Sequence, residues 1–88
     1  MTEVDVSTIS LRALRAVVAV ADAGSFTGAA LHLGLGQSAV SHAIARLEKT
    51  FGLELFIRRR DGVEPTDAAL RLLTRIRAAL ADIEAALD

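Results

Sequence analysis

The chain has 88 residues, of which 52% are hydrophobic and 3% aromatic, and its formal net charge is −1 at pH 7. A chain of this length builds one small domain, and a mixture rich in aliphatic and poor in aromatic side chains favours packed helices over a sandwich or barrel. The absence of cysteine excludes disulfides, zinc–thiolate sites and thiol nucleophiles. No apolar run reaches the ~18 residues of a membrane span, and an acidic N-terminus with Glu3 and Asp5 argues against a signal peptide. We therefore expect a cytoplasmic protein that does not enter a membrane.

The small net charge hides an uneven distribution. Between Leu11 and Arg60 there are seven basic and three acidic residues, a balance of +4, whereas three basic and six acidic residues between Asp61 and Asp88 give −3. The first segment is therefore suited to contact phosphate, and the second is not.

Helical periodicity begins after residues 1–8, which we expect to form a loose tail. Ser10 is a suitable N-cap and Gly24 a suitable C-terminal stop, which predicts a first helix over about 10–23. The apolar side chains at helical spacing in this segment are Leu11, Leu14, Val17, Val18 and Ala21.

Two further helices are predicted on either side of a short turn. The second begins at Ser25 or Phe26 and ends near Leu33, and the glycines of 34–36 make the turn. The third is predicted over about 37–51, with an apolar face formed by Val40, Ile44, Leu47 and Phe51. A helix-turn-helix whose second helix begins with small polar side chains is suited to enter a DNA groove.

A two-stranded wing is predicted over about 53–64. Residues 53–57 have strand character, the turn at 59–62 contains Asp-Gly, and residues 63–64 form the return strand, which Pro65 ends. Such a short hairpin requires packing against the helices.

The last predicted helix begins after the N-cap Thr66 and runs to Leu87. Its apolar residues alternate at spacings of four and three, which is the pattern of a coiled-coil seam. They are Ala69, Leu73, Ile76, Leu80, Ile83 and Leu87. We expect the compact part of the chain to cover the first turn, and the same helix of a second chain to cover the remainder, from Leu73 onward.

Polar and basic side chains near the turn and the wing are the candidate DNA contacts. On the third helix, Gln37 can bond a base edge because its amide offers a donor and an acceptor together. The other candidates on this helix are Ser38, Ser41, His42 and Arg46. Ser25 and Thr27 begin the second helix, where hydroxyls and backbone N–H groups favour a phosphate; the alternative is simple capping of the helix, and both roles can hold at once.

Three consecutive arginines, Arg58, Arg59 and Arg60, are the strongest electrostatic feature. On a wing they would meet the DNA backbone or a narrow minor groove. The alternative for these arginines, as for the polar residues of the third helix, is an ordinary solvated surface.

The sequence resembles the N-terminal DNA-binding domain of the LysR-type transcriptional regulators over residues 9–88. The resemblance rests on residues in the order and at the spacing of that family: Leu11-Arg12-Ala13-Leu14, Gly24-Ser25-Phe26-Thr27, Ala29-Ala30, Gln37-Ser38-Ala39-Val40-Ser41, Ile44, Leu47-Glu48, Phe51-Gly52, Leu55-Phe56-Ile57-Arg58 and Pro65-Thr66. It departs from the family pattern at Gly36, His42 and Pro65, where Ser, a basic or Gln-like residue, and Leu are common.

The resemblance implies a mainly α fold. Residues 1–65 would form a winged helix-turn-helix of three helices and a two-stranded wing, and residues 66–88 a long linker helix that forms a homodimer. Such a dimer would bind a dyad-symmetric operator in double-stranded DNA at the nucleoid. In the family a larger C-terminal domain, absent from these 88 residues, binds a small-molecule effector. We interpret the chain as an excised DNA-binding domain, with a natural stand-alone protein as the alternative.

Two other classes of function remain as alternatives. The same fold could serve as a protein-interaction module that pairs with another regulator without binding DNA, which the acidic last third of the chain would suit. An enzyme is disfavoured, because no phosphate-binding loop and no cluster of histidines and carboxylates is present. We expect no cofactor, and no metal at the isolated His32 or His42.

Overall fold

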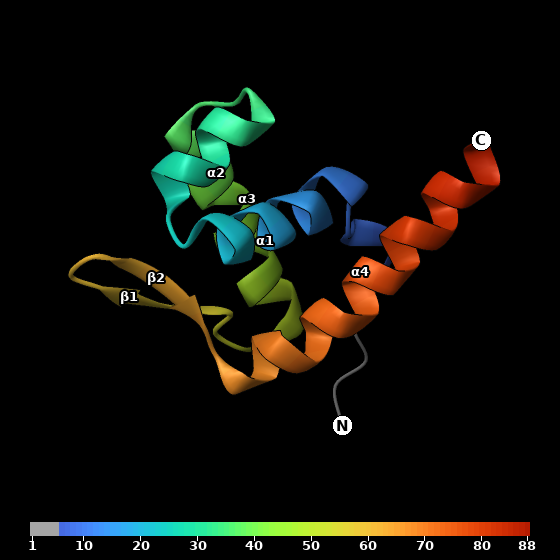
Figure 1. Ribbon diagram of the computed structural model, residues 1–88. Helices are drawn as coiled ribbons and strands as arrows, with labels where there is room; N and C mark the ends of the chain where they lie inside the picture. Colours follow the sequence, from blue (N-terminus) through green and yellow to red (C-terminus); the bar gives the residue numbers. More distant parts are fainter. Residues whose placement is uncertain (1–5) are drawn as a thin grey trace.

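Three helices pack together, a hairpin projects beside them, and a long fourth helix leads away from the body (Figure 1). The computed structural model describes residues 6–88. Its elements are a 3-10 turn η1 (Val6–Thr8), α1 (Leu11–Ala23), α2 (Phe26–Leu33), α3 (Gln37–Phe51), β1 (Phe56–Arg59), β2 (Gly62–Pro65) and α4 (Asp67–Leu87). The mainly α fold with a two-stranded wing is therefore confirmed. The expected loose tail falls partly on residues 1–5, which lie outside the described residues, whereas 6–8 form a turn of 3-10 helix instead.

Side-chain caps explain where three of the four α-helices begin. The hydroxyl oxygens of Ser10, Ser25 and Thr66 accept hydrogen bonds from backbone N–H groups three residues ahead, at 3.1, 2.9 and 3.1 Å. Each bond satisfies one of the donors that a helix leaves unpaired in its first turn. Helix α3 lacks this device, because its N-cap is Gly36.

Helix α1 lies at the centre of the fold, where α2, α3, α4 and β2 all contact it. Its buried residues are Ala16, Val17, Ala19 and Val20, while Leu11 is 50% exposed. The helix predicted from the apolar spacing is present, but its buried residues are not the same set as the apolar residues at that spacing. A helix surrounded on several sides buries adjacent small residues as well as one stripe, whereas the side chain of Leu11, in the first turn of α1, remains half exposed.

Helix α3 follows the predicted amphipathic pattern. Val40, Ile44 and Leu47 are buried, and Phe51 is half-buried. Most of the polar side chains between them are exposed, so that α3 presents one polar face along its length.

The wing is shorter at its start than predicted. Phe56 pairs with Pro65 and Arg59 with Gly62, so β1 begins at Phe56 and Pro65 belongs to β2. Leu55 lies just before β1: its N–H donates to a carboxylate oxygen of Glu48 at 2.8 Å, and its carbonyl accepts from the Thr66 N–H at 2.9 Å. The bond from Thr66 continues the register of the hairpin, but the matching bond from Leu55 N–H to the Thr66 carbonyl is missing, because Glu48 accepts from the Leu55 N–H and the Thr66 carbonyl accepts from Leu70 N–H at 2.9 Å as α4 begins.

Gly62 allows the wing to dock on the body. Its φ is +146°, and a Cβ atom built on it would lie 2.3 Å from the carbonyl oxygen of Gly24. The same oxygen accepts a hydrogen bond from the Val63 N–H at 2.9 Å. A side chain at 62 would therefore separate the hairpin from the turn between α1 and α2.

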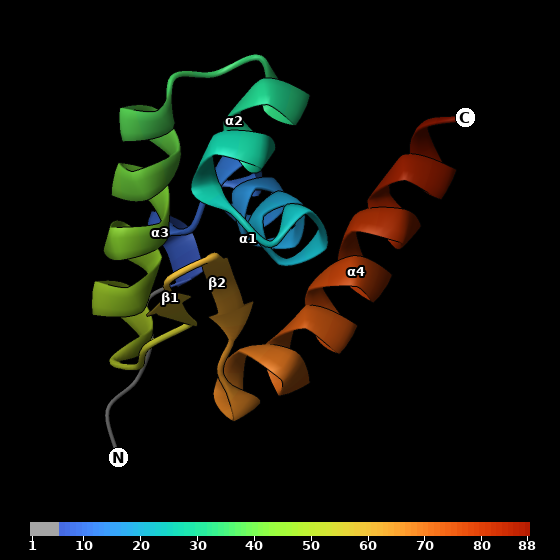
Figure 2. The same cartoon turned by 60° about the vertical axis from the view of Figure 1, so that its left-hand side comes forward.

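Helix α4 divides into a packed half and a projecting half. Ala69, Leu73 and Ile76 are buried against the rest of the chain, Leu80 is half-buried, and Ile83 and Leu87 are 40% and 82% exposed. Helices α3 and α4 lie on different sides of α1 (Figure 2). Within residues 6–88, no helix is both long and apolar enough to cross a membrane.

Candidate nucleic-acid interface

The N-terminal turn of α3 is open to solvent. Gln37, Ser38 and Ala39 are exposed, and Gly36 supplies no side-chain hydrogen bond to the backbone N–H groups behind them. Further along the same helix, His42 and Arg46 are exposed and Ser41 is half-buried. The side chains predicted from the sequence to contact DNA therefore lie on the polar face of α3 and at its beginning.

Helix α2 touches α3 through a polar pair at this exposed end. The hydroxyl of Thr27 donates to the Oε1 atom of Gln37 at 3.2 Å, across ten residues of sequence. Thr27 is exposed, whereas the neighbouring Ser25 is half-buried and uses its hydroxyl oxygen to cap α2. The capping role therefore holds at Ser25, whereas the hydroxyl of Thr27 bonds to Gln37.

Arg58 extends from β1 over the beginning of α2. The carbon atom of its guanidinium lies 4.5 Å from the ring centroid of Phe26, within the range of a cation–π contact. The Phe26 ring also packs edge-on against Phe56, with centroids 6.4 Å apart and an interplanar angle of 72°. An aromatic pair in the core therefore holds the wing arginine in place.

The other two arginines of the wing differ from each other. Arg59 forms an ion pair with Glu64 on the facing strand, with its Nε atom 3.0 Å from Oε1. Arg60 is exposed in the turn and, like Arg58, makes no ion pair within residues 6–88. The positive charge available at the wing is therefore that of Arg58 and Arg60.

A groove between α1 and α3 extends this surface. It has a volume of about 260 Å³, and Arg12 of α1 lines it together with His42 and Arg46 of α3. The sequence had identified Arg12 only as part of a basic segment, since its position beside α3 depends on the packing of two helices. Three basic or titratable side chains from two helices thus share one groove.

On the α4 side of the molecule, an ion pair joins α4 to α1. Arg77 of α4 binds Asp22 of α1 through two hydrogen bonds, of 2.7 and 3.4 Å. The hydrogen bond from Arg77 holds the pKa of Asp22 below its usual value and raises that of Arg77. This pair and the buried Leu73 and Ile76 fix the packed half of α4 on the body.

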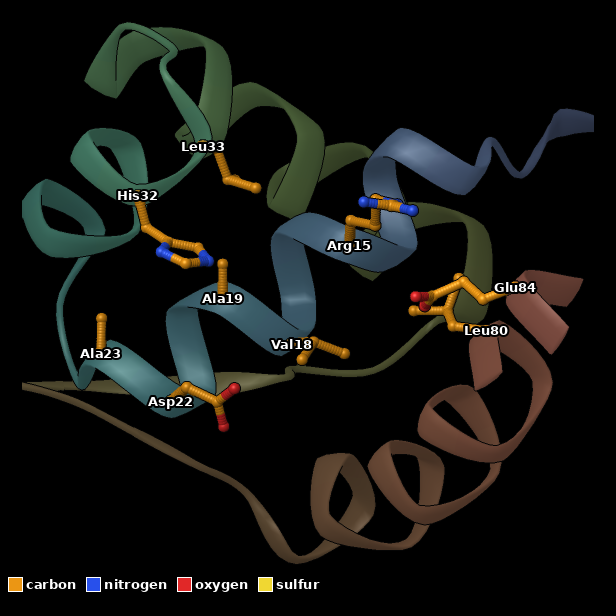
Figure 3. Close-up of a pocket in the computed structure, with 9 residues that line it drawn as sticks. All are labelled: Arg15, Val18, Ala19, Asp22, Ala23, His32, Leu33, Leu80 and Glu84. Atoms are coloured by element: carbon orange, nitrogen blue, oxygen red, sulfur yellow. The ribbon is translucent and has the colours of Figure 1, made fainter. Parts of the chain in front are cut away.

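A hollow of about 440 Å³ lies beside this pair, between α1, α2 and the projecting half of α4 (Figure 3). Its charged side chains are of both signs, with Arg15 opposed by Asp22 and Glu84. Mixed charge does not suit a polyanion such as DNA. We therefore do not count the hollow as part of the candidate DNA-binding surface formed by α3 and the wing.

The predicted dimer seam is only partly available to a second chain. Leu73 and Ile76 were expected to face a partner, but both are buried within this chain because α4 packs on α1 beyond its first turn. The part of the seam that remains accessible is Leu80, Ile83 and Leu87. Among the described residues, no group of three or more His, Cys, Asp or Glu side chains could hold a metal ion.

The comparison with known families decides the classification. Residues 11–70 match the family described as bacterial regulatory helix-turn-helix protein, lysR family. The chain belongs to the LysR family. Proteins of this family are transcriptional regulators and not enzymes.

Two relatives with curated descriptions are several times longer than this chain. The small neutral protease regulatory protein of Streptomyces coelicolor is 45% identical over 67 residues, which are 76% of this chain and 21% of the relative. The HTH-type transcriptional regulator PgrR of Escherichia coli strain K12 is 42% identical over 74 residues, 84% of this chain and 25% of the relative. The chain thus spans between a fifth and a quarter of the length of these relatives.

Solved structures confirm the fold at the level of the isolated domain. The DNA-binding domain of CbnR, solved in a complex with DNA, superposes with a TM-score of 0.84 and 30% identity over 88% of both chains. The DNA-binding domain of BenM in its complex with catB site 1 DNA gives a TM-score of 0.84 and 31% identity over 89% of this chain and 84% of the other. The LysR-family chain described here therefore matches the N-terminal DNA-binding domains of such regulators.

Proposed function

We propose that this LysR-family domain binds double-stranded DNA sequence-specifically, with α3 in the major groove and the wing on the adjacent backbone or minor groove. One observation carries the proposal. The first turn of α2 joins two candidate contacts that are 21 positions apart in the sequence, since Thr27 holds Gln37 and the adjacent Phe26 holds Arg58. Because α2 fixes both side chains, they meet DNA as one preformed surface.

Within this surface the side chains have different tasks. Gln37 and Ser38, at the exposed start of α3, would contact base edges or phosphates, as would Ser41 and His42 one turn further on. Arg58 and Arg60 would contact the backbone or a narrow minor groove, and Arg46, with Arg12 beside it, the flanking phosphates. Arg59 contributes less, because Glu64 already neutralises it.

We further propose that two copies pair through the accessible part of α4, formed by Leu80, Ile83 and Leu87. In this arrangement residues 1–65 form the DNA-binding domain, and residues 66–88 form the linker helix that pairs with the second copy. A symmetric pair presents two copies of α3 to a dyad-symmetric operator. Such a regulator works at the nucleoid in the cytoplasm, and it responds to a small-molecule effector only if a separate domain supplies the binding site.

Binding to a pool of random duplex DNA tests this function. Fluorescence anisotropy at about 50 and about 200 mM salt measures affinity, and sequencing of the retained duplexes reveals any preferred site. We expect enriched dyad sites and an affinity that falls steeply with salt. Absence of binding at low salt, together with ready formation of mixed dimers, would instead support an interaction module.

Two substitutions separate the tasks of the surface. Arg58→Ala should weaken binding to all duplexes and flatten the salt dependence by about one phosphate contact per chain. Arg71→Ala is the matched control, because it removes the same charge from the exposed face of α4. Gln37→Ala should change base preference more than the salt dependence. Unchanged affinity in the first variant and unchanged preference in the second would refute the assignment of these contacts.

A further inference from the structure

The hydrogen bond between Thr27 and Gln37 determines which end of the Gln37 amide faces away from α2. Thr27 Oγ1 donates to Gln37 Oε1 at 3.2 Å, so the carboxamide oxygen is turned toward α2. The Nε2 atom of Gln37 forms no hydrogen bond within the part of the chain that the structure describes, residues 6–88. Since the two ends of a planar amide point apart, its two N–H donors face solvent at the exposed start of α3.

We propose that Thr27 is a positioning residue for base recognition, which orients Gln37 as a hydrogen-bond donor toward DNA. This inference rests on the proposed function and deepens it by naming the class of base edge selected. A glutamine that is free to rotate reads adenine through one donor and one acceptor together. With Oε1 turned toward α2, Gln37 instead presents its N–H donors to DNA. It therefore favours guanine, whose N7 and O6 are both acceptors, or thymine O4, over adenine, whose N7 acceptor lies beside the N6 donor that needs Oε1.

Thr27 and Gln37 are both accessible at the beginnings of their helices. Thr27 is the second residue of α2 and Gln37 the first of α3, and both side chains are exposed. The Thr27 hydroxyl has one hydrogen, and the bond to Gln37 uses it. The neighbouring Ser25 is half-buried and caps α2 by accepting from the Gly28 N–H, and it makes no hydrogen bond to Gln37 within the described residues.

Two variants of Thr27 isolate the hydroxyl. Thr27→Ser keeps the donor, whereas Thr27→Val keeps the shape of the side chain and removes it. In selection from random duplexes, we expect wild type and Thr27→Ser to enrich guanine or thymine at one position of each half-site. Thr27→Val should lose about threefold to tenfold of that discrimination, the worth of a single hydrogen bond, and should gain adenine at the same position.

A double substitution separates positioning from direct contact with DNA. In a Gln37→Ala background, adding Thr27→Val should leave base preference and affinity unchanged, because the hydroxyl would then have no amide to orient. If Thr27 contacted a phosphate itself, Thr27→Val would instead lower affinity for all duplexes equally in both backgrounds. That outcome, with base preference unchanged, would overturn the inference.

Nuclear magnetic resonance of the free protein provides a readout that does not depend on DNA. The side-chain amide resonances of Gln37 should shift in Thr27→Val and remain in place in Thr27→Ser. Resonances that Thr27→Val does not move would overturn the inference even if wild type binds DNA. If wild type bound no duplex, the proposed function and the role in base recognition would fail together, while shifted resonances would still verify the contact itself.

Discussion

The docking of the wing on the α1–α2 turn makes Gly62→Ala the most informative test of the fold. A Cβ atom at this position would lie 2.3 Å from the backbone oxygen of Gly24, and no rotamer change can relieve a clash with backbone. The hairpin must then move, which breaks the bond between Val63 N–H and Gly24 O, worth about 1 kcal/mol. Strain at a φ of +146° adds about 1–3 kcal/mol, so we expect a total loss of about 2–4 kcal/mol.

Gly52→Ala is the matched control for this substitution. Gly52 also has a positive φ, of +71°, but a Cβ atom there would meet nothing within 4 Å. It should therefore cost only the conformational strain, about 1–2 kcal/mol. Thermal unfolding followed by circular dichroism at one protein concentration measures both variants. A Gly62→Ala protein no less stable than Gly52→Ala would refute the close approach of wing and turn.

Three further predictions concern the ends and sides of the helices. Gly36→Ser should stabilise the domain by about 0.5–1 kcal/mol in urea titrations, because it gives α3 the missing side-chain cap at an unstrained position; no gain would mean that the serine does not cap the helix. Because the Arg77 hydrogen bond lowers the pKa of Asp22, the stability it adds is present above the ordinary value of 3.8 and is lost as pH falls through the folded value. Asp22→Asn should therefore flatten the acid limb of the stability–pH curve slightly, since the pair is exposed, and an unchanged limb would contradict this origin. Ile83→Asp should shift the protein from dimer to monomer in analytical ultracentrifugation without lowering its helix content, and an unchanged sedimentation coefficient would refute pairing through this face.

Features set by neighbouring residues could be predicted from the sequence. The helix starts after Ser10, Ser25 and Thr66 are such features, because a cap acts over three residues. The buried stripe of α3 is another, because one side of that helix faces the body and the other faces solvent. The candidate side chains on α3 could be chosen for the same reason.

Features that depend on a distant partner could not be predicted. The periodicity of the last helix identified an apolar face, but it did not reveal that α1 covers Leu73 and Ile76. The strand predicted from Leu53 begins later because Glu48, on another element, binds the backbone of Leu55. The positions of Arg58 over Phe26 and of Thr27 beside Gln37 likewise result from how α2 packs.

The anchoring of α4 to the body makes its projecting half a rigid lever. From Ile76 to Leu87 this half is about 17 Å long at 1.5 Å per residue, and nothing in its sequence would bend it. If this helix tilts by about 10° about its C-terminal end, the three-helix body at its other end moves by about 3 Å, which is close to the separation of neighbouring base pairs. In a pair of chains joined through these levers, small changes at the C-terminal end are therefore converted into changes of spacing between the two copies of α3.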